Sequence, residues 1–180
     1  MMAEVESRGF LFVLDANSYD HINAVAKWAT QKGKFGLLLS GSYGNGKSTL
    51  VRALQSVTSY VFDSKYPNAQ PHDKVALRMV NALHVSNVAK TDDNAFDRIA
   101  TAPFLAIDDV GLEPAEVMNY GNVINPLVQL ITYRYDNLLP TIITTNLTPA
   151  QIREHYGERI ADRFVEFFER IVFTNPSYRR

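Results

Sequence analysis

A glycine-rich segment between two apolar stretches constrains this chain more than any other feature. Residues 35–39 have the composition of a buried strand, and residues 41–48 follow the pattern Gly-x-x-x-x-Gly-Lys-Ser. Between a strand and a helix, this pattern is that of a loop whose backbone N–H groups cradle phosphates. Lys47 supplies a mobile positive charge, and Ser48 supplies a hydroxyl that can ligate Mg²⁺. A turn between a core strand and a core helix would require neither residue.

The helix predicted to begin at Lys47 adds a second attraction for anions, because its first N–H groups lack partners and its dipole is positive there. We therefore expect ATP or ADP to bind at this helix N-terminus, with Mg²⁺ beside the phosphates. The residues expected to contact the nucleotide are Gly41, Ser42, Tyr43, Gly44, Asn45, Gly46, Lys47, Ser48 and Thr49.

Composition limits the class of protein. Of the 180 residues, 46% are hydrophobic and 21% are charged, which fits a single globular domain over residues 1–180 with a short lead-in at 1–9. No apolar run approaches the ~20 residues of a membrane span, and the acidic start lacks an apolar leader, so we expect a cytoplasmic protein. The absence of cysteine excludes disulfides and thiol catalysis.

The charge balance gives no overall attraction to nucleic acid, because the formal net charge is −1. Any DNA binding would need a local patch of basic residues. The sequence leaves open whether such a patch is formed by Lys74, Arg78, Lys90 and Arg134.

Strand-like and helix-like segments alternate along the chain, which predicts an α/β fold with a mostly parallel central sheet. The expected strands or extended segments cover residues 10–14, 35–39, 75–80, 104–107, 141–144 and 170–174. The expected helices cover residues 19–31, 47–58, 83–89, 94–99, 126–136, 149–156 and 158–168.

The apolar strand predicted at residues 104–107 is followed by two acids, Asp108 and Asp109. Mg²⁺ requires hard oxygen ligands, so we expect Asp108 to ligate it together with Ser48. Asp109 lies one residue further and could orient or deprotonate the attacking water. Asp is also a common turn residue, so either acid could instead cap the turn at residues 110–111.

Another apolar strand, predicted at residues 141–144, leads to the neutral amide of Asn146. An amide can donate to the γ-phosphate or position the water without adding charge repulsion. Asn146 is therefore the candidate sensor of the γ-phosphate. An asparagine also ends strands in ordinary turns, and that alternative stays open.

Arg159 and Arg163 lie four residues apart in a predicted helix and therefore on one face of it. Two arginines on one face indicate an anionic partner. That partner could be an acid of the same helix, namely Glu158, Asp162 or Glu166. It could also be the γ-phosphate held by a neighbouring subunit.

With these motifs in this order, the chain resembles AAA+ ATPases, specifically the branch of DnaC/DnaI helicase loaders and IstB transposition ATPases. The resemblance spans residues 12–178 and rests on segments 41–50, 105–111, 134–135, 140–147 and 156–164. It implies a P-loop NTPase three-layer fold of AAA+ type without a separate lid domain. It also implies ATP hydrolysis and a homo-oligomer whose interfaces contain the active sites.

The resemblance implies a role for each residue singled out above. It places Lys47 at the phosphates, Ser48 and Asp108 at Mg²⁺, and Asp109 in the position of the catalytic acid. It also implies that Asn146 is sensor 1 and that Arg163, with Arg159 as second choice, is an arginine finger acting on a neighbouring subunit. By the same resemblance, residues 10–15 would lie near the adenine.

The function that the resemblance implies is that of a cytoplasmic ATPase of DNA replication, which loads or remodels a replicative helicase on single-stranded DNA. Two features differ from the family pattern. Only about nine residues precede the core, where loaders carry a helicase-gripping region, and the chain ends too soon after the last strand for a helical lid with its sensor 2 arginine. Three alternatives stay open: an IstB-like helper of a transposase, a nucleotide-dependent scaffold with negligible turnover, and a small-molecule kinase.

Overall fold

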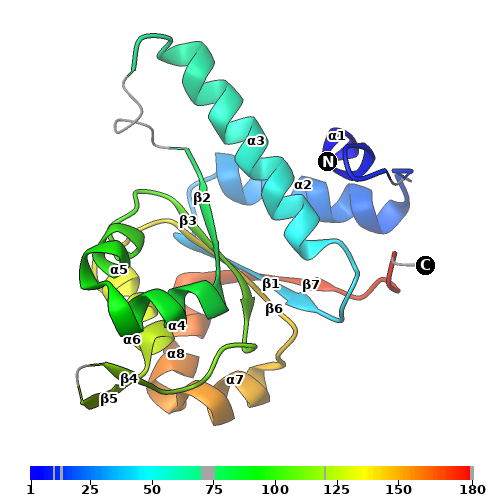
Figure 1. Ribbon diagram of the computed structural model, residues 1–180. Coiled ribbons are helices and arrows are strands. Elements are labelled where there is room, and N and C mark those ends of the chain that lie inside the picture. The colour runs from blue at the N-terminus through cyan, green and yellow to red at the C-terminus, as the bar shows by residue number, and fades with distance from the viewer. Residues whose placement is uncertain (10, 13, 70–75, 120, 179–180) are drawn as a thin grey trace.

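The computed structural model describes residues 1–9, 11–12, 14–69, 76–119 and 121–178 (Figure 1). Parts of two predicted strands, at residues 10, 13 and 75, lie outside the described residues, as does Lys74.

A parallel sheet forms the centre of the molecule, and its strand order is β2-β3-β6-β1-β7. Its strands are β1 (Gly36–Gly41), β2 (Arg78–Asn81), β3 (Leu105–Val110), β6 (Thr141–Thr145) and β7 (Phe168–Phe173). Each neighbouring pair in this sheet is parallel. The predicted α/β fold with a parallel central sheet is therefore confirmed. The order places β6 between β1 and β3, so the strand ends that carry the candidate site residues are neighbours.

Helices cover both faces of the sheet (Figure 1). On one face the core contains α2 (Ala16–Thr30) and α3 (Lys47–Lys65). The other face is covered by α4 (Ala82–Thr91), α5 (Asp93–Ala100), α6 (Pro126–Asp136), α7 (Pro149–Tyr156) and α8 (Glu158–Phe167). Alternate residues of β1 serve the two cores, since Leu37 and Leu39 belong to the first and Leu38 to the second. None of the described helices is both long enough and apolar enough to cross a membrane.

Two predictions of secondary structure were incomplete. The elements absent from the prediction are α1 (Met2–Glu6) and the hairpin of β4 (Val117–Asn119) and β5 (Asn122–Ile124), because elements of three to five residues are too short to show a periodic pattern. The predicted end of α3, near residue 58, is also too early. The last turns of α3 extend beyond the sheet (Figure 1) and expose Tyr60, so they lack the buried apolar face that marks a helix in sequence.

Arg134 corrects one open possibility about DNA binding. Its side chain is fully buried, and its guanidinium donates to Thr141 Oγ1 and to the carbonyl oxygens of Ala100, Ala102 and Pro140, each at 2.8 Å. Burial lowers the pKa of Arg134 to about 10, so it stays protonated at neutral pH. An enclosed guanidinium cannot contact DNA, and a basic patch that includes Arg134 is excluded.

Candidate functional site

The glycine-rich loop joins β1 to α3 at the carboxyl edge of the sheet. Gly44 and Gly46 have φ angles of 75° and 98°, which residues with a Cβ rarely adopt. Gly46 is the N-cap of α3 and has no side chain, so it accepts no hydrogen bond from the first N–H groups of the helix through a side chain. A Cβ at Gly41 would lie 2.3 Å from the carbonyl oxygen of Phe173. The loop therefore depends on glycine both for its backbone angles and for its close contact with β7.

The side chain of Lys47 connects this loop to the end of β6. It is only 5% exposed, and its Nζ donates to the carbonyl oxygens of Gly41 and Ser42, both at 2.8 Å. The same Nζ donates to Oδ1 of Asn45 at 3.1 Å and to Oδ1 of Asn146 at 2.9 Å. The structure therefore brings the predicted phosphate-binding lysine and the predicted sensor into direct contact.

The other predicted loop residues lie around this lysine. Ser42 and Tyr43 are exposed, and Thr49 is half-buried in the first turn of α3. Asn45 is buried, and its Nδ2 donates to the carbonyl oxygen of Phe173 at 3.2 Å. Asn45 thus holds the loop against β7 while its amide oxygen accepts from Lys47.

Ser48 and Asp108 lie next to each other, as expected for residues that share a metal ion. Ser48 Oγ donates to Asp108 Oδ1 at 2.7 Å, and Asp108 is only 6% exposed. Among the described residues no cluster of three or more His, Cys, Asp or Glu could hold a metal ion. A hydroxyl and one carboxylate fit Mg²⁺, which takes few protein ligands and completes its shell with phosphates and water.

Thr144 is a site residue that the sequence analysis missed. It is buried in β6, and its Oγ1 donates to Asp108 Oδ1 at 2.6 Å. The same Oγ1 accepts from the backbone N–H of Asp109 at 2.9 Å. One threonine therefore positions both acids. Its position two residues before Asn146, near the end of a strand predicted to be buried, was the available signal.

Asp109 has an unusual backbone conformation. Its φ angle is 58°, in the left-handed region that is uncommon for residues other than glycine. The pairing of β3 with β6 is irregular between Ile107 and Val110, so both acids lie at a local distortion of the strand. Such distortions and strained residues are concentrated next to functional sites, where they direct a side chain toward a ligand.

Arg163 is tied to α6 and not to an acid of its own helix. Its guanidinium donates to Thr132 Oγ1 and to Asp136 Oδ1, the latter at 3.4 Å, and lies 4.9 Å from the centre of the Tyr135 ring. Its side chain is 11% exposed. Glu166, one of the acids considered as a partner, accepts from the Tyr135 hydroxyl at 2.6 Å. Arg163 is thus held within its own subunit by three α6 residues.

Arg159 differs from Arg163 in its surroundings. It lies in the first turn of α8, its side chain is exposed, and no hydrogen bond or ion pair joins it to another described residue. The structure therefore brings together Lys47, Ser48, Asp108 and Asn146, but it brings neither arginine to them. The role of an arginine finger stays a prediction for both.

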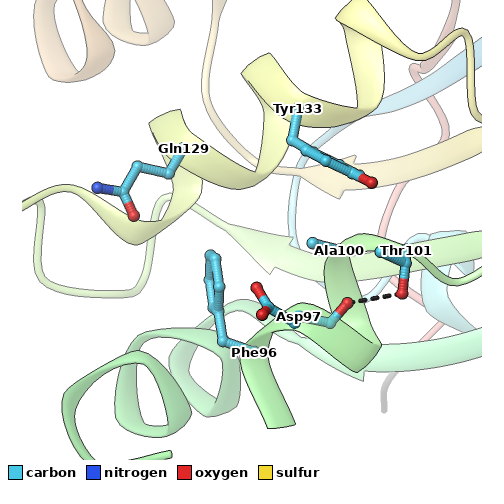
Figure 2. A pocket seen from close by; sticks show the side chains of 6 residues that line it. All are labelled: Phe96, Asp97, Ala100, Thr101, Gln129 and Tyr133. Atoms are coloured by element: carbon cyan, nitrogen blue, oxygen red, sulfur yellow. Dashed lines mark hydrogen bonds between the residues drawn. The ribbon is translucent and has the colours of Figure 1, made fainter. Parts of the chain in front are cut away.

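A cavity of about 420 Å³ lies between α5 and α6, away from this group of residues (Figure 2). Its lining residues are Phe96, Asp97, Ala100, Thr101, Gln129 and Tyr133. None of them is a predicted site residue, and none belongs to the ends of β1, β3 or β6. The cavity is therefore separate from the candidate nucleotide site.

Comparison with known proteins supports the fold. No family model and no curated protein matches this chain. The solved structure of DnaI has a TM-score of 0.66 and 22% sequence identity, covering 94% of this chain and 88% of that one. The DnaC helicase loader has a TM-score of 0.59 and 21% identity, covering 91% and 93%. AMPPCP-bound DnaA from Aquifex aeolicus has a TM-score of 0.56 and 16% identity, covering 89% and 48%.

These identities are low, so the comparisons establish the fold alone. The resemblance inferred from the motifs is confirmed at that level: this chain has an α/β fold with a parallel central sheet that is similar to the folds of DnaI and the DnaC helicase loader.

Proposed function

We propose that this protein is a Mg²⁺-dependent ATPase of the AAA+ type that acts in DNA replication, with residues 1–180 forming one ATPase unit. One observation carries the proposal. Lys47 contacts Asn146, and the neighbouring Ser48 contacts Asp108. A cation, an amide, a hydroxyl and a carboxylate from the loop and from the ends of β3 and β6 therefore lie together at one edge of the sheet. Nucleotides bind at this edge of parallel sheets.

Binding of the triphosphate is assigned to the loop backbone, to Lys47 and to the N-terminus of α3. The N–H groups of residues 44–48 would converge on the phosphate oxygens. Lys47 now donates to neutral carbonyl and amide oxygens, and phosphate oxygens would be stronger acceptors because they are charged. Ser48 and Asp108 would hold Mg²⁺, which neutralises charge on the β- and γ-phosphates when it is bound.

Hydrolysis is assigned to Asp109 and Asn146. Asp109 would orient or deprotonate the attacking water, and its backbone is held in place for this by Thr144. Asn146 would report the γ-phosphate, and its contact with Lys47 supports this, because Lys47 is the residue that we assign to the phosphates.

We assign the arginine finger to α8 of a neighbouring subunit in a homo-oligomer. The exposure of Arg159 supports it over Arg163, whose guanidinium is held by α6. If Arg159 is the finger, the Arg159→Ala protein should bind ATP normally and hydrolyse it poorly, since a finger stabilises the transition state.

Mixing inactive variants tests this assignment. Arg159→Ala subunits keep an intact loop, and Lys47→Ala subunits keep an intact finger, so the mixture should recover part of the activity. A mixture of Arg163→Ala with Lys47→Ala subunits is measured in the same way, and the activity recovered in the two mixtures is compared. No recovery with either arginine variant, in samples shown to co-assemble, would contradict a finger acting between subunits.

The proposed partner is a replicative helicase, loaded or remodelled on single-stranded DNA in the cytoplasm. Similarity of the fold to DnaI and to the DnaC helicase loader supports this choice. The net charge of −1 indicates that DNA binding by one subunit is weak and that it strengthens only when an oligomer repeats the same contacts. A transposase is the alternative partner, and capture of one or the other by purified protein decides between them.

The deciding experiment is a titration of the protein with ATP in the presence and absence of Mg²⁺, followed by steady-state hydrolysis with and without single-stranded DNA. We expect Mg²⁺-dependent binding and turnover that DNA or assembly increases. Absence of ATP binding would overturn the proposal. ATP binding without hydrolysis under every condition would indicate a nucleotide-dependent scaffold. Transfer of phosphate to a small molecule would indicate a kinase.

A further inference from the structure

The segment that follows β7 lies along the glycine-rich loop. We call residues 174–178 the closing segment. Its Tyr178 backbone N–H donates to the carbonyl oxygen of Gly44 at 2.8 Å, and Asn175 Nδ2 donates to that of Asn45 at 3.2 Å. Asn175 is only 3% exposed. The closing segment is therefore attached to the loop backbone at two points, and its position relative to the loop is defined.

The side chain of Tyr178 is held at its other end by α2. Its hydroxyl is 2.9 Å from one carboxylate oxygen of Asp15 and 3.1 Å from the hydroxyl of Ser18. Asp15 itself is the N-cap of α2. Between these anchors the ring passes Gly46, where a Cβ would lie 3.7 Å from two ring carbons. The aromatic ring thus lies beside the last glycine of the loop, at a distance where a side chain on that glycine would touch it, yet Tyr178 remains 42% exposed.

The position of Tyr178 follows from the strand order. β1 lies between β6 and β7. The groups assigned to the γ-phosphate and Mg²⁺, namely Asn146 and Asp108, lie on the β6 side of the loop. A nucleoside triphosphate is an extended molecule, so its nucleoside must lie away from these groups. The other neighbour of β1 is β7, which continues directly into the closing segment.

We propose that Tyr178 forms one wall of the nucleoside site and stacks on the base of the bound nucleotide. This inference rests on the proposed nucleotide binding and adds a residue to the same site. Aromatic stacking is tolerant of the base, because every base presents a π-face. Tyr178 therefore contributes affinity for nucleotides in general, and discrimination between adenine and guanine comes from other groups.

The test separates the base from the phosphates. Wild-type protein, Tyr178→Ala and Tyr178→Phe are each titrated with ATP, GTP and inorganic triphosphate in the presence of Mg²⁺. Tyr178→Ala should weaken binding of both nucleotides about tenfold, the scale of one lost stacking contact, and leave inorganic triphosphate unchanged. Tyr178→Phe keeps the ring and should bind like wild type. Tyr60→Ala removes an exposed tyrosine on the projecting part of α3 and serves as the control.

Two results would overturn the inference. Equal weakening of ATP and inorganic triphosphate by Tyr178→Ala would mean that the closing segment only supports the loop. Tighter binding of both ligands would mean that Tyr178 obstructs the site. These results concern the variants, whereas failure of wild-type protein to bind ATP would overturn the proposed function itself. Circular dichroism of each variant excludes misfolding as the cause of a loss.

Discussion

Two buried cations lie at opposite edges of the same sheet. Lys47 is at the carboxyl edge and is 5% exposed, and Arg134 is at the amino edge and is 0% exposed. Both donate to neutral oxygens: Arg134 mainly to the backbone, and Lys47 equally to the backbone and to side-chain amides. Arg134 joins the first residue of β6, Thr141, to the carbonyl oxygens of Ala102 and Pro140, which come just before β3 and β6.

The difference between the two cations is in what surrounds them. Every hydrogen-bond partner of Arg134 belongs to the protein core. Its guanidinium therefore joins segments at the amino edge and is not accessible to a ligand. Lys47 lies among glycines with positive φ and beside the Ser48–Asp108 pair, where a polyanion and its metal ion can be accommodated. We therefore expect the cation at the amino edge to contribute to stability and the cation at the carboxyl edge to bind a ligand.

The largest expected effect is at Lys47. Lys47→Ala should abolish ATP binding or nearly so, because the loop amides must then hold a polyanion without a neutralising cation. The thermal stability of the variant should change much less than its affinity. A nucleotide titration and a melting curve measure the two quantities. Unchanged ATP affinity would remove the distinction between the two edges.

Arg134→Met should have the opposite pattern. It removes a donor from the carbonyl oxygens of Ala100, Ala102 and Pro140, although the Pro140 oxygen still accepts from the Leu105 N–H. Each unsatisfied buried acceptor costs about 1–3 kcal/mol, so we expect the other two to lower the free energy of unfolding by at least about 2 kcal/mol. Denaturant unfolding measures this loss, and ATP affinity of the remaining folded protein should be near that of wild type. Arg98→Met, at an exposed arginine, is the control. Selective loss of ATP binding without loss of stability would assign Arg134 to the site.

Asp109→Asn should distinguish the roles of the two acids at the carboxyl edge, Asp108 and Asp109. It should leave ATP binding largely intact and lower kcat about 10²-fold, the usual scale of a lost general base. Asp108→Asn, by contrast, should weaken the dependence of binding on Mg²⁺. Binding and turnover measured side by side separate the two acids. Equal effects of Asp109→Asn on both would indicate that it only caps the turn after β3.

The parts of the carboxyl edge that could be predicted belong to local motifs. The loop at 41–48, the start of α3 and the acids after β3 each have a signature within a few residues. The parallel sheet then brings these strand ends together, which explains the contact between Lys47 and Asn146. Their proximity follows from the fold class, although their roles in binding and hydrolysis stay predictions.

The remaining contacts could not be predicted because they join residues that are far apart in the sequence. The hydroxyl contact between Ser18 and Tyr178 spans 160 residues, and neither residue stands out locally. Arg134 looks like a surface arginine on an amphipathic helix until the ends of α5 and β6 are placed around it. Thr144 looks like an ordinary β-branched strand residue. In each case the partner, and not the residue itself, determines the role.

The smallest expected effect is a pH dependence confined to the carboxyl edge. His21 of α2 stacks on Phe173 at the end of β7, with ring centroids 3.8 Å apart. Burial lowers the pKa of His21 below its usual 6.5, and this outweighs the opposing influence of the Val172 backbone and of Asp20 and Asp15. The unfolded chain therefore binds more protons than the folded protein just below this pH, so the stability contributed by neutral His21 is complete above about pH 6.5 and declines as the pH falls.

His21→Phe should remove that part of the pH dependence while keeping an aromatic contact with Phe173. The expected change is only about 0.5 kcal/mol or less, because the ring is partly solvated and its charge is screened. Denaturant unfolding of wild type and variant at pH 8 and pH 5.5 measures the difference, and His84→Gln, at an exposed histidine of α4, is the matched control. If His84→Gln altered the pH dependence as much as His21→Phe, the titration would belong to the surface in general and not to the carboxyl edge.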